Sequence, residues 1–179
     1  MEELLKIDRA FNEGTFITKV NNIFIMLHSA IMMDDLNRVR HFISDEVALK
    51  YENILKKLNE QNVRQMYDEL NVKETTIKNI QIYDERVIIS VDIISRYMDY
   101  VVDKVSGKFI SGENTRRVEK INRLEFTKLR SNNIYNIDKK CPGCGANIDV
   151  NNNGKCPYCG SIFNAKDYDW ILTSIDVEV

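Results

Sequence analysis

The residues best suited to chemistry are four cysteines, which are the only cysteines of the chain and lie in one short stretch. They form two Cys-Pro-x-Cys-Gly motifs, with eleven residues between Cys144 and Cys156. A Cys-x-x-Cys turn brings two sulfurs to one point, and the glycine after it tolerates the backbone conformation of such a turn. Two such pairs supply four thiolates, the donor set of a structural zinc site. We therefore predict one zinc ion per chain, bound by Cys141, Cys144, Cys156 and Cys159.

Three other interpretations of the cysteines stay open. A thioredoxin-like redox pair would begin a helix, whereas these pairs lie among turn residues. Iron accepts the same four ligands. Two disulfides would suit a secreted protein, but no signal peptide precedes the motifs. Because four cysteine ligands leave no coordination position for a substrate, the predicted metal would hold shape and would not catalyse.

The composition allows one globular domain and a small module, with 179 residues of which 44% are apolar. A net charge of −2 gives no overall field that favours nucleic acid or an acidic membrane. Residues 104–130 nevertheless carry eight basic side chains against three acidic ones. They predict either a solvated outer sheet face or a patch that docks to an acidic partner or to anionic lipids. The patch would consist of Arg116, Arg117, Lys120 and Arg123.

The first third of the chain has the residue spacing of helices. A short amphipathic piece spans residues 2–11, and an apolar stripe follows over residues 16–31. Its most apolar run, residues 23–33, is shorter than the roughly 20 residues that cross a bilayer, so we expect no spanning segment. A short helix should follow Asp34 or Asp35. Ser44, followed by two acids, predicts the N-cap of a third helix whose apolar stripe runs over residues 47–58.

The later residues alternate as strands do. We expect strands over residues 72–83, from residue 87 onward and over 116–130, with a change of phase between Ile93 and Met98 and another after Ile121. Two long strands that change phase predict a strongly bent antiparallel sheet. A last strand over residues 167–179 should pair with the strand over 116–130, with strict alternation that places Ile171 and Ile175 on the face opposite to Leu172.

The expected fold class is therefore α+β: N-terminal helices packed on a strongly bent, cone-like antiparallel sheet, with a small zinc ribbon of four cysteines inserted before the last strand. The main domain would comprise residues 1–130 together with 167–179, and the inserted ribbon residues 131–166. A connection of this length needs structure of its own, which the metal would supply.

This order of elements resembles the Tim-forty-four-like (Tim44-like) family of the nuclear-transport-factor-two-like superfamily, in its bacterial type with an inserted zinc ribbon. The matching residues are Phe24, Ala30, residues 34–44, Asp99-Tyr100, Asp103, Ser106-Gly107-Lys108, the two cysteine motifs and residues 169–175. The resemblance implies a non-catalytic domain that docks to protein partners or a membrane surface and has an apolar pocket for a hydrophobic ligand. It also implies a cytoplasmic location, membrane-associated through a segment absent from this chain.

An enzyme is the first alternative, because related cone-shaped folds host isomerases and dehydratases. Asp99 is the carboxylate that we expect to face inward as a general base, with Tyr97 or Tyr100 as hydrogen-bond donor and Trp170 in the same pocket. His28 lies in an apolar run, which favours a packed core histidine. Nucleic-acid binding through the ribbon is a weaker alternative, because acidic residues offset the lysines of the module.

Overall fold

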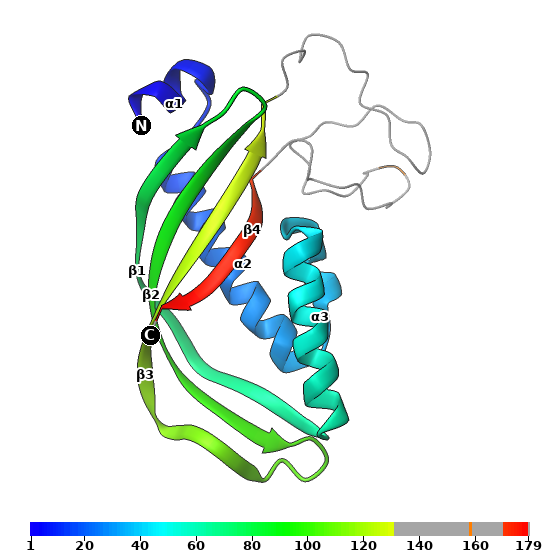
Figure 1. The fold of residues 1–179 in the computed structure, drawn as a ribbon. Coiled ribbons are helices and arrows are strands. Elements are labelled where there is room, and N and C mark those ends of the chain that lie inside the picture. The colour runs from blue at the N-terminus through cyan, green and yellow to red at the C-terminus, as the bar shows by residue number, and fades with distance from the viewer. Residues whose placement is uncertain (131–157, 159–169, 179) are drawn as a thin grey trace.

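The computed structural model describes residues 1–130, 158 and 170–178 (Figure 1). Helices come first and strands follow, which confirms the α+β class. The helical elements are α1 (Glu2–Ile7), α2 (Glu13–Met33), the 3₁₀ turns η1 (Leu36–Arg38) and η2 (Arg40–Phe42), and α3 (Asp45–Glu60). The strands are β1 (Val63–Ile82), β2 (Arg86–Asp103), β3 (Phe109–Leu129) and β4 (Ile171–Glu178). They form one antiparallel sheet in the order β1-β2-β3-β4, with α2 and α3 on one face of its curve.

The helices begin where side chains satisfy free backbone amides. Asn12 accepts a hydrogen bond from the Thr15 amide at 2.9 Å before α2, and Ser44 accepts one from the Val47 amide at 3.2 Å before α3. The predicted cap at Ser44 is thus confirmed. Helix α2 ends at Asp34, whose φ of 56° is left-handed. The short helix expected next is the pair of 3₁₀ turns.

The core lies between α2 and the concave face of the sheet. Alternate residues of a strand face the same side, and β2 presents an unbroken apolar row to the helix. The buried apolar residues of α2 are Phe16, Val20, Ile23, Phe24, Leu27, Ala30 and Ile31, and those of the β2 row are Val87, Ile89, Val91 and Ile93.

Helix α2 is longer than the apolar run seen in the sequence. It spans 21 residues and is long and apolar enough to cross a membrane by length and composition, so the expectation of no such segment is wrong on that criterion. Its buried face packs on the sheet, however, as does that of an ordinary core helix. We therefore treat α2 as part of the core.

Strand β4 rejoins the sheet after the segment that holds the cysteines. It pairs with residues 121–127 of β3, which confirms the pairing predicted across the insertion. Phe126 lies opposite Leu172. Leu124 lies opposite Ile175, so β4 has one more residue than β3 between these two pairs. Leu172 and Ile175 therefore both enter the core, and the predicted strict alternation along β4 is wrong.

The sheet bends because β1 and β3, the two neighbours of β2, are longer than β2. Every second residue of β2 from Val87 to Tyr97 is buried, so the phase change expected inside β2 is wrong. Extra residues lie instead in β1, at three register shifts, and in β3 between Glu113 and Val118. Ile121 keeps a regular register and simply faces outward, so the second expected phase change is also misplaced.

Strand β3 tests how much the core depends on one side chain. Leu124→Ala removes a fully buried side chain, and we expect the free energy of unfolding to fall by about 2–5 kcal/mol. Ile121→Ala, on the exposed face of the same strand, should cost less than about 1 kcal/mol. Denaturant unfolding of both variants measures the difference. Equal losses would contradict this assignment of the two faces.

Candidate functional site

An aromatic cluster occupies the concave face toward the end of α2. His28 of α2, Tyr67 of β1 and Tyr97 of β2 have ring centroids 4.7, 5.5 and 5.4 Å apart. Nδ1 of His28 lies 2.9 Å from the carbonyl oxygen of Phe24. A carbonyl only accepts, so Nδ1 carries the proton and Nε2 of the neutral ring is an acceptor.

Burial keeps this cluster uncharged. The pKa of His28 lies below its ordinary value because desolvation outweighs the opposing effects of the Phe24 carbonyl and the Asp99 charge. Burial also raises the pKa of Tyr97 to about 12 and raises that of Tyr67. His28 is therefore buried, hydrogen-bonded and neutral, which confirms the interpretation as a core histidine.

Asp99 lies at the rim of the cluster. It shares the concave face with Tyr97 by strand alternation. Nε2 of Gln65 donates to its Oδ1 at 2.8 Å, and Nζ of Lys120 lies 3.7 Å from its Oδ2. Tyr100 faces the other side of the sheet, where its hydroxyl donates to Asp68 at 2.5 Å and that bond raises the pKa of Tyr100. The expected pairing of Asp99 with Tyr100 is therefore not formed.

Trp170 lies far from Asp99. Its ring centroid lies 6.0 Å from that of Phe11 and 5.2 Å from that of Phe16, and the Lys128 ammonium lies 5.8 Å from it. Lys128 pairs with the first residues of β2, ten positions from Tyr97, or roughly 30 Å along the strand. Trp170 is a core residue at the opposite end of the sheet, and the structure does not bring it into one pocket with Asp99.

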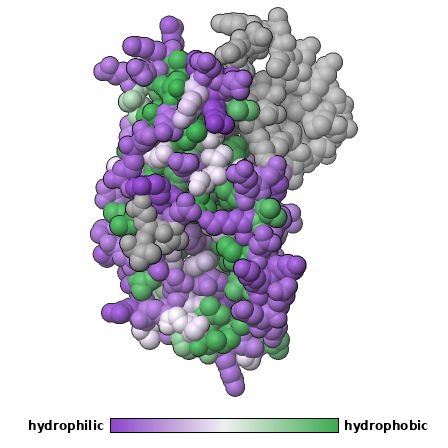
Figure 2. Space-filling model, viewed as in Figure 1, coloured by the Kyte–Doolittle hydropathy of each residue, from purple (hydrophilic) through white to green (hydrophobic). Residues whose placement is uncertain are grey.

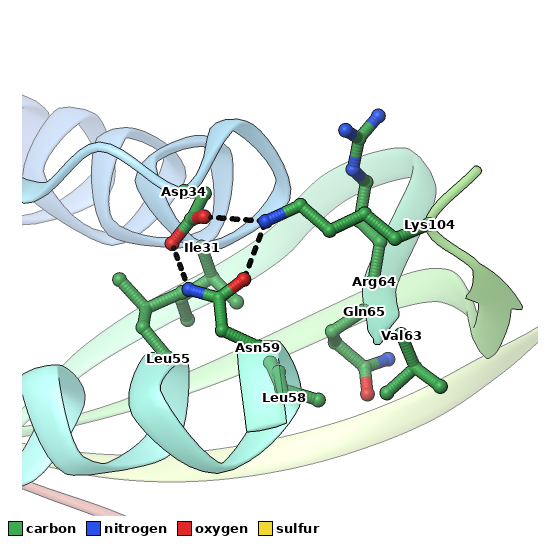
Figure 3. A pocket seen from close by; sticks show the side chains of 9 residues that line it. All are labelled: Ile31, Asp34, Leu55, Leu58, Asn59, Val63, Arg64, Gln65 and Lys104. Carbon is green, nitrogen blue, oxygen red and sulfur yellow. Dashed lines mark hydrogen bonds and ion pairs between the residues drawn. The ribbon is translucent and has the colours of Figure 1, made fainter. Parts of the chain in front are cut away.

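A small pocket lies where α2, α3, β1 and the end of β2 meet (Figure 3). Asp34 accepts hydrogen bonds from Lys104 at 2.8 Å and from Asn59 at 3.0 Å, and Lys104 also donates to Asn59. The Lys104 hydrogen bond is the main reason that the pKa of Asp34 is lowered. The pocket admits about one water molecule, which is far too little for a hydrophobic ligand.

The residues of the expected docking patch lie on both faces of the sheet, and their positive charges are paired with carboxylates. Arg117 and Arg123 lie on the convex face, whereas Lys120 lies on the concave face. Each of the four cations has a carboxylate partner, which lowers the field that it presents to a distant anion. The pairs are Arg116 with Glu113 at 3.2 Å, Arg117 with Glu69 at 3.6 Å, Lys120 with Asp99 at 3.7 Å, and Arg123 with Asp92 at 2.8 and 3.1 Å.

The four predicted zinc ligands lie outside the described residues, so the zinc site stays a prediction. Within residues 1–130, 158 and 170–178, no group of three or more histidine, cysteine or acidic side chains could hold a metal ion. The structure does fix the ends of the insertion, because Thr127 pairs with Ile171. The chain therefore leaves and re-enters the sheet at neighbouring positions.

Two buried polar side chains were not predicted from the sequence. Oγ of Ser95 and Nδ2 of Asn122 are buried and have no hydrogen-bond partner among the residues that the structure describes. Both face the concave side, on neighbouring strands, in line with the buried rows of β2 and β3. The available signal was a polar residue at an inward position of an otherwise apolar alternation. Each unsatisfied group costs about 1–3 kcal/mol, which makes the pair a candidate contact for a small polar molecule.

The neutral state of His28 predicts a pH dependence of stability. The unfolded chain binds a proton below about pH 6.5 that the folded chain excludes, so the free energy of unfolding falls as the pH drops below that value. One such proton contributes a slope of up to about 1.4 kcal/mol per pH unit. His28→Gln should remove this contribution between pH 7 and 5, whereas His41→Gln, at the other histidine, should keep it. An unchanged slope in His28→Gln, measured by denaturant unfolding, would contradict the assignment.

Comparison with known proteins identifies a family. The profile of the Tim44-like domain matches residues 1–137, which include α1 to β3. A crystal structure of the intermembrane space region of the chloroplast protein ARC6 is similar over 89% of this chain and 94% of that one, with 7% identity and a TM-score of 0.40. A likeness that distant carries no argument about function. No curated protein matches the chain.

Proposed function

The chain belongs to the Tim44-like domain family, and from this premise we propose that it is a docking domain that binds a protein partner or a membrane surface without catalysing a reaction. The observation that supports this most is the filled concave face. Helix α2 covers the apolar row of β2, and the pocket at its C-terminal end admits about one water molecule. A domain whose concave face is occupied by its own helices binds with its outer surface.

The surroundings of Asp99 agree with this proposal. A general base must reach a substrate proton within hydrogen-bond distance. Both oxygens of Asp99 already face partners, one from Gln65 and one from Lys120. We infer that Asp99 has a structural role, in which it links Gln65 of β1 and Lys120 of β3 at the end of the sheet.

We place the domain in the cytoplasm at a membrane surface, as a bacterial-type member with an inserted ribbon.

We also infer that the cysteines hold one structural zinc ion. The fit rests on the donor set, because four thiolates are the ligands of a closed structural site. The paired ends of β3 and β4 favour a compact insertion, since they hold residues 130 and 170 close together. The metal would supply folding free energy to the segment between them.

A small-ligand binder is a second candidate, which the unsatisfied Ser95 and Asn122 favour. These groups lie on the same face as Asp99 and Tyr97. A small polar molecule could satisfy both. If this second function includes catalysis, Asp99→Asn should abolish turnover while leaving the fold intact.

Metal analysis tests the zinc inference. The purified chain should contain about one zinc per chain, and replacing Cys141, Cys144, Cys156 and Cys159 by serine should abolish it. Chelation should lower the thermal midpoint of the unsubstituted chain and leave that of the serine variant unchanged. Iron in place of zinc, or no metal with two disulfides by mass spectrometry, would contradict the inference.

Binding measurements test the docking function. The full chain should bind either an immobilised unfolded polypeptide, such as reduced and alkylated lactalbumin, or vesicles that contain anionic phospholipid. Native lactalbumin and pure phosphatidylcholine vesicles are the controls. Failure to bind both probes would refute the docking proposal. Affinity for duplex DNA with a steep salt dependence would instead favour the nucleic-acid alternative.

A further inference from the structure

The concave face of the sheet becomes polar beyond Ile93. Up to that residue, the inward side chains of β2 are apolar and α2 packs on them. Strand β4 pairs only with residues 121–127 of β3, so β1, β2 and β3 extend past it at this end of the sheet (Figure 1). Polar side chains from five elements meet there. We call them the polar recess: His28 of α2, Tyr51 of α3, Tyr67 of β1, Ser95 and Tyr97 of β2, and Asn122 of β3.

Three tyrosine hydroxyls in the polar recess have no protein partner. Tyr97 is 3% exposed, and Tyr51 and Tyr67 are partly buried. None of the three hydroxyls forms a hydrogen bond with another residue that the structure describes. A buried tyrosine hydroxyl usually has a partner. Three that lack one at a single place point to a bound molecule.

The three hydroxyls lie close enough to contact the same molecule. The rings of Tyr67 and Tyr97 are 5.4 Å apart. Tyr51 approaches them from α3: its pKa is raised first by burial and then by the charge of Tyr97. The pKa of Tyr67 is likewise raised by burial, and the charges of Asp99, Tyr97 and Tyr51 add to it. Because Tyr51 and Tyr67 are partly exposed, a molecule can reach them from solvent.

The polar recess offers both donors and acceptors. Nε2 of His28 is an acceptor and forms no hydrogen bond with the part of the chain that the structure describes. Nδ2 of Asn122 is a donor, and the hydroxyl of Ser95 is either. By register, Asn122 lies diagonally across from Ser95, and Ser95 precedes Tyr97 by two residues on the same face. A ligand that satisfies these groups must itself both donate and accept.

The charges around the polar recess favour a neutral ligand. Asp99 lies 3.7 Å from the Lys120 ammonium, and Asp176, which is near Tyr51, lies 3.4 Å from that of Lys50. A charged ligand would lose hydration here and find each opposite charge already paired. Anions and cations are therefore both disfavoured.

The outer surface offers weaker candidates. Hydrophilic side chains predominate on the face shown in Figure 2, and the apolar ones form small separate areas. Such areas are normal on a protein surface and need no partner. Unpaired hydroxyls in a recess are uncommon, so they carry more information about a ligand.

We propose that the polar recess binds a small neutral molecule rich in hydroxyl groups, such as a sugar or another polyol. This rests on the second candidate function, small-ligand binding, and names its ligand class. A hydroxyl group both donates and accepts, so it can serve the tyrosines and His28 together, whereas a carbonyl group only accepts. The proposed ligand differs from the hydrophobic one that the family resemblance implies.

Nuclear magnetic resonance titration of the full chain tests the proposal with glycerol, xylose, glucose and myo-inositol. At least one of these should shift the signals of the polar recess. Tyr51→Phe and Tyr97→Phe should each weaken its binding about fivefold, because each removes one hydroxyl partner. The matched control is Tyr83→Phe, at a residue 46% exposed in the turn between β1 and β2, which should bind as the unsubstituted chain does. Unchanged binding in both recess variants would overturn the polar recess as the site.

Thermal unfolding of the ligand-free chain provides a second measurement. Tyr97→Phe should not lower the thermal midpoint, because it removes a buried hydroxyl that has no partner. A midpoint lower by more than about four degrees would mean that the hydroxyl is already bonded in the free chain, for example to a buried water. That result would contradict the proposal.

Charged analogues of glucose separate the ligand class from the function. Glucosamine and glucuronate should bind at least about tenfold more weakly than the neutral sugar, because their charges find no free partner in the polar recess. Binding of a charged analogue alone would overturn the neutral class and leave small-ligand binding standing. If none of these probes binds, small-ligand binding itself is refuted. The docking function is measured separately with polypeptide and vesicles, so it does not depend on this result.

Discussion

The pairing of β4 with β3 is the interaction on which the rest of the structure depends, because it completes the core after a long interruption of the chain. Closing the 39 residues between Arg130 and Trp170 costs roughly 3 kcal/mol in chain entropy. Burial of Trp170, Leu172 and Ile175 contributes at most about 5–9 kcal/mol of hydrophobic free energy. This exceeds the entropic cost, so closing the connection is favourable. The same strand holds the start of α3, because the Ser44 amide donates to the Leu172 carbonyl at 2.9 Å.

The local sequence was sufficient to predict the helices and the presence of the strands. Ser44 and the acids after it define the start of α3 because a cap is a property of neighbouring residues. The start of β1 at Val63 was missed, because residues 63–71 are mostly polar and lie on an edge strand. The register shifts were misplaced for a different reason. A shift is a difference in length between two strands, and a strand read alone does not contain it.

The candidate sites were harder to predict than the fold. Asp99 was expected on the inner face because of a phase change in β2; it does lie there, but by the regular alternation of β2, and the sequence could not show that Gln65 and Lys120 would occupy its oxygens. A cluster of basic residues in sequence likewise implied a patch. The register instead places Arg123 beside Asp92, and the two form a bidentate pair. Both errors arise from partners on other strands, which only the assembled sheet supplies.

The adjacent ends of the insertion have a consequence for how such a chain can vary. Because Thr127 and Ile171 are neighbours in the sheet, the connection between them must only start and finish at one place. The length and sequence of the connection can then change without altering the strand registers or the packing of the helices. This position is a natural splice point. Modules of other sizes, or a fluorescent reporter in an engineered chain, could be exchanged there while the parent scaffold keeps its shape.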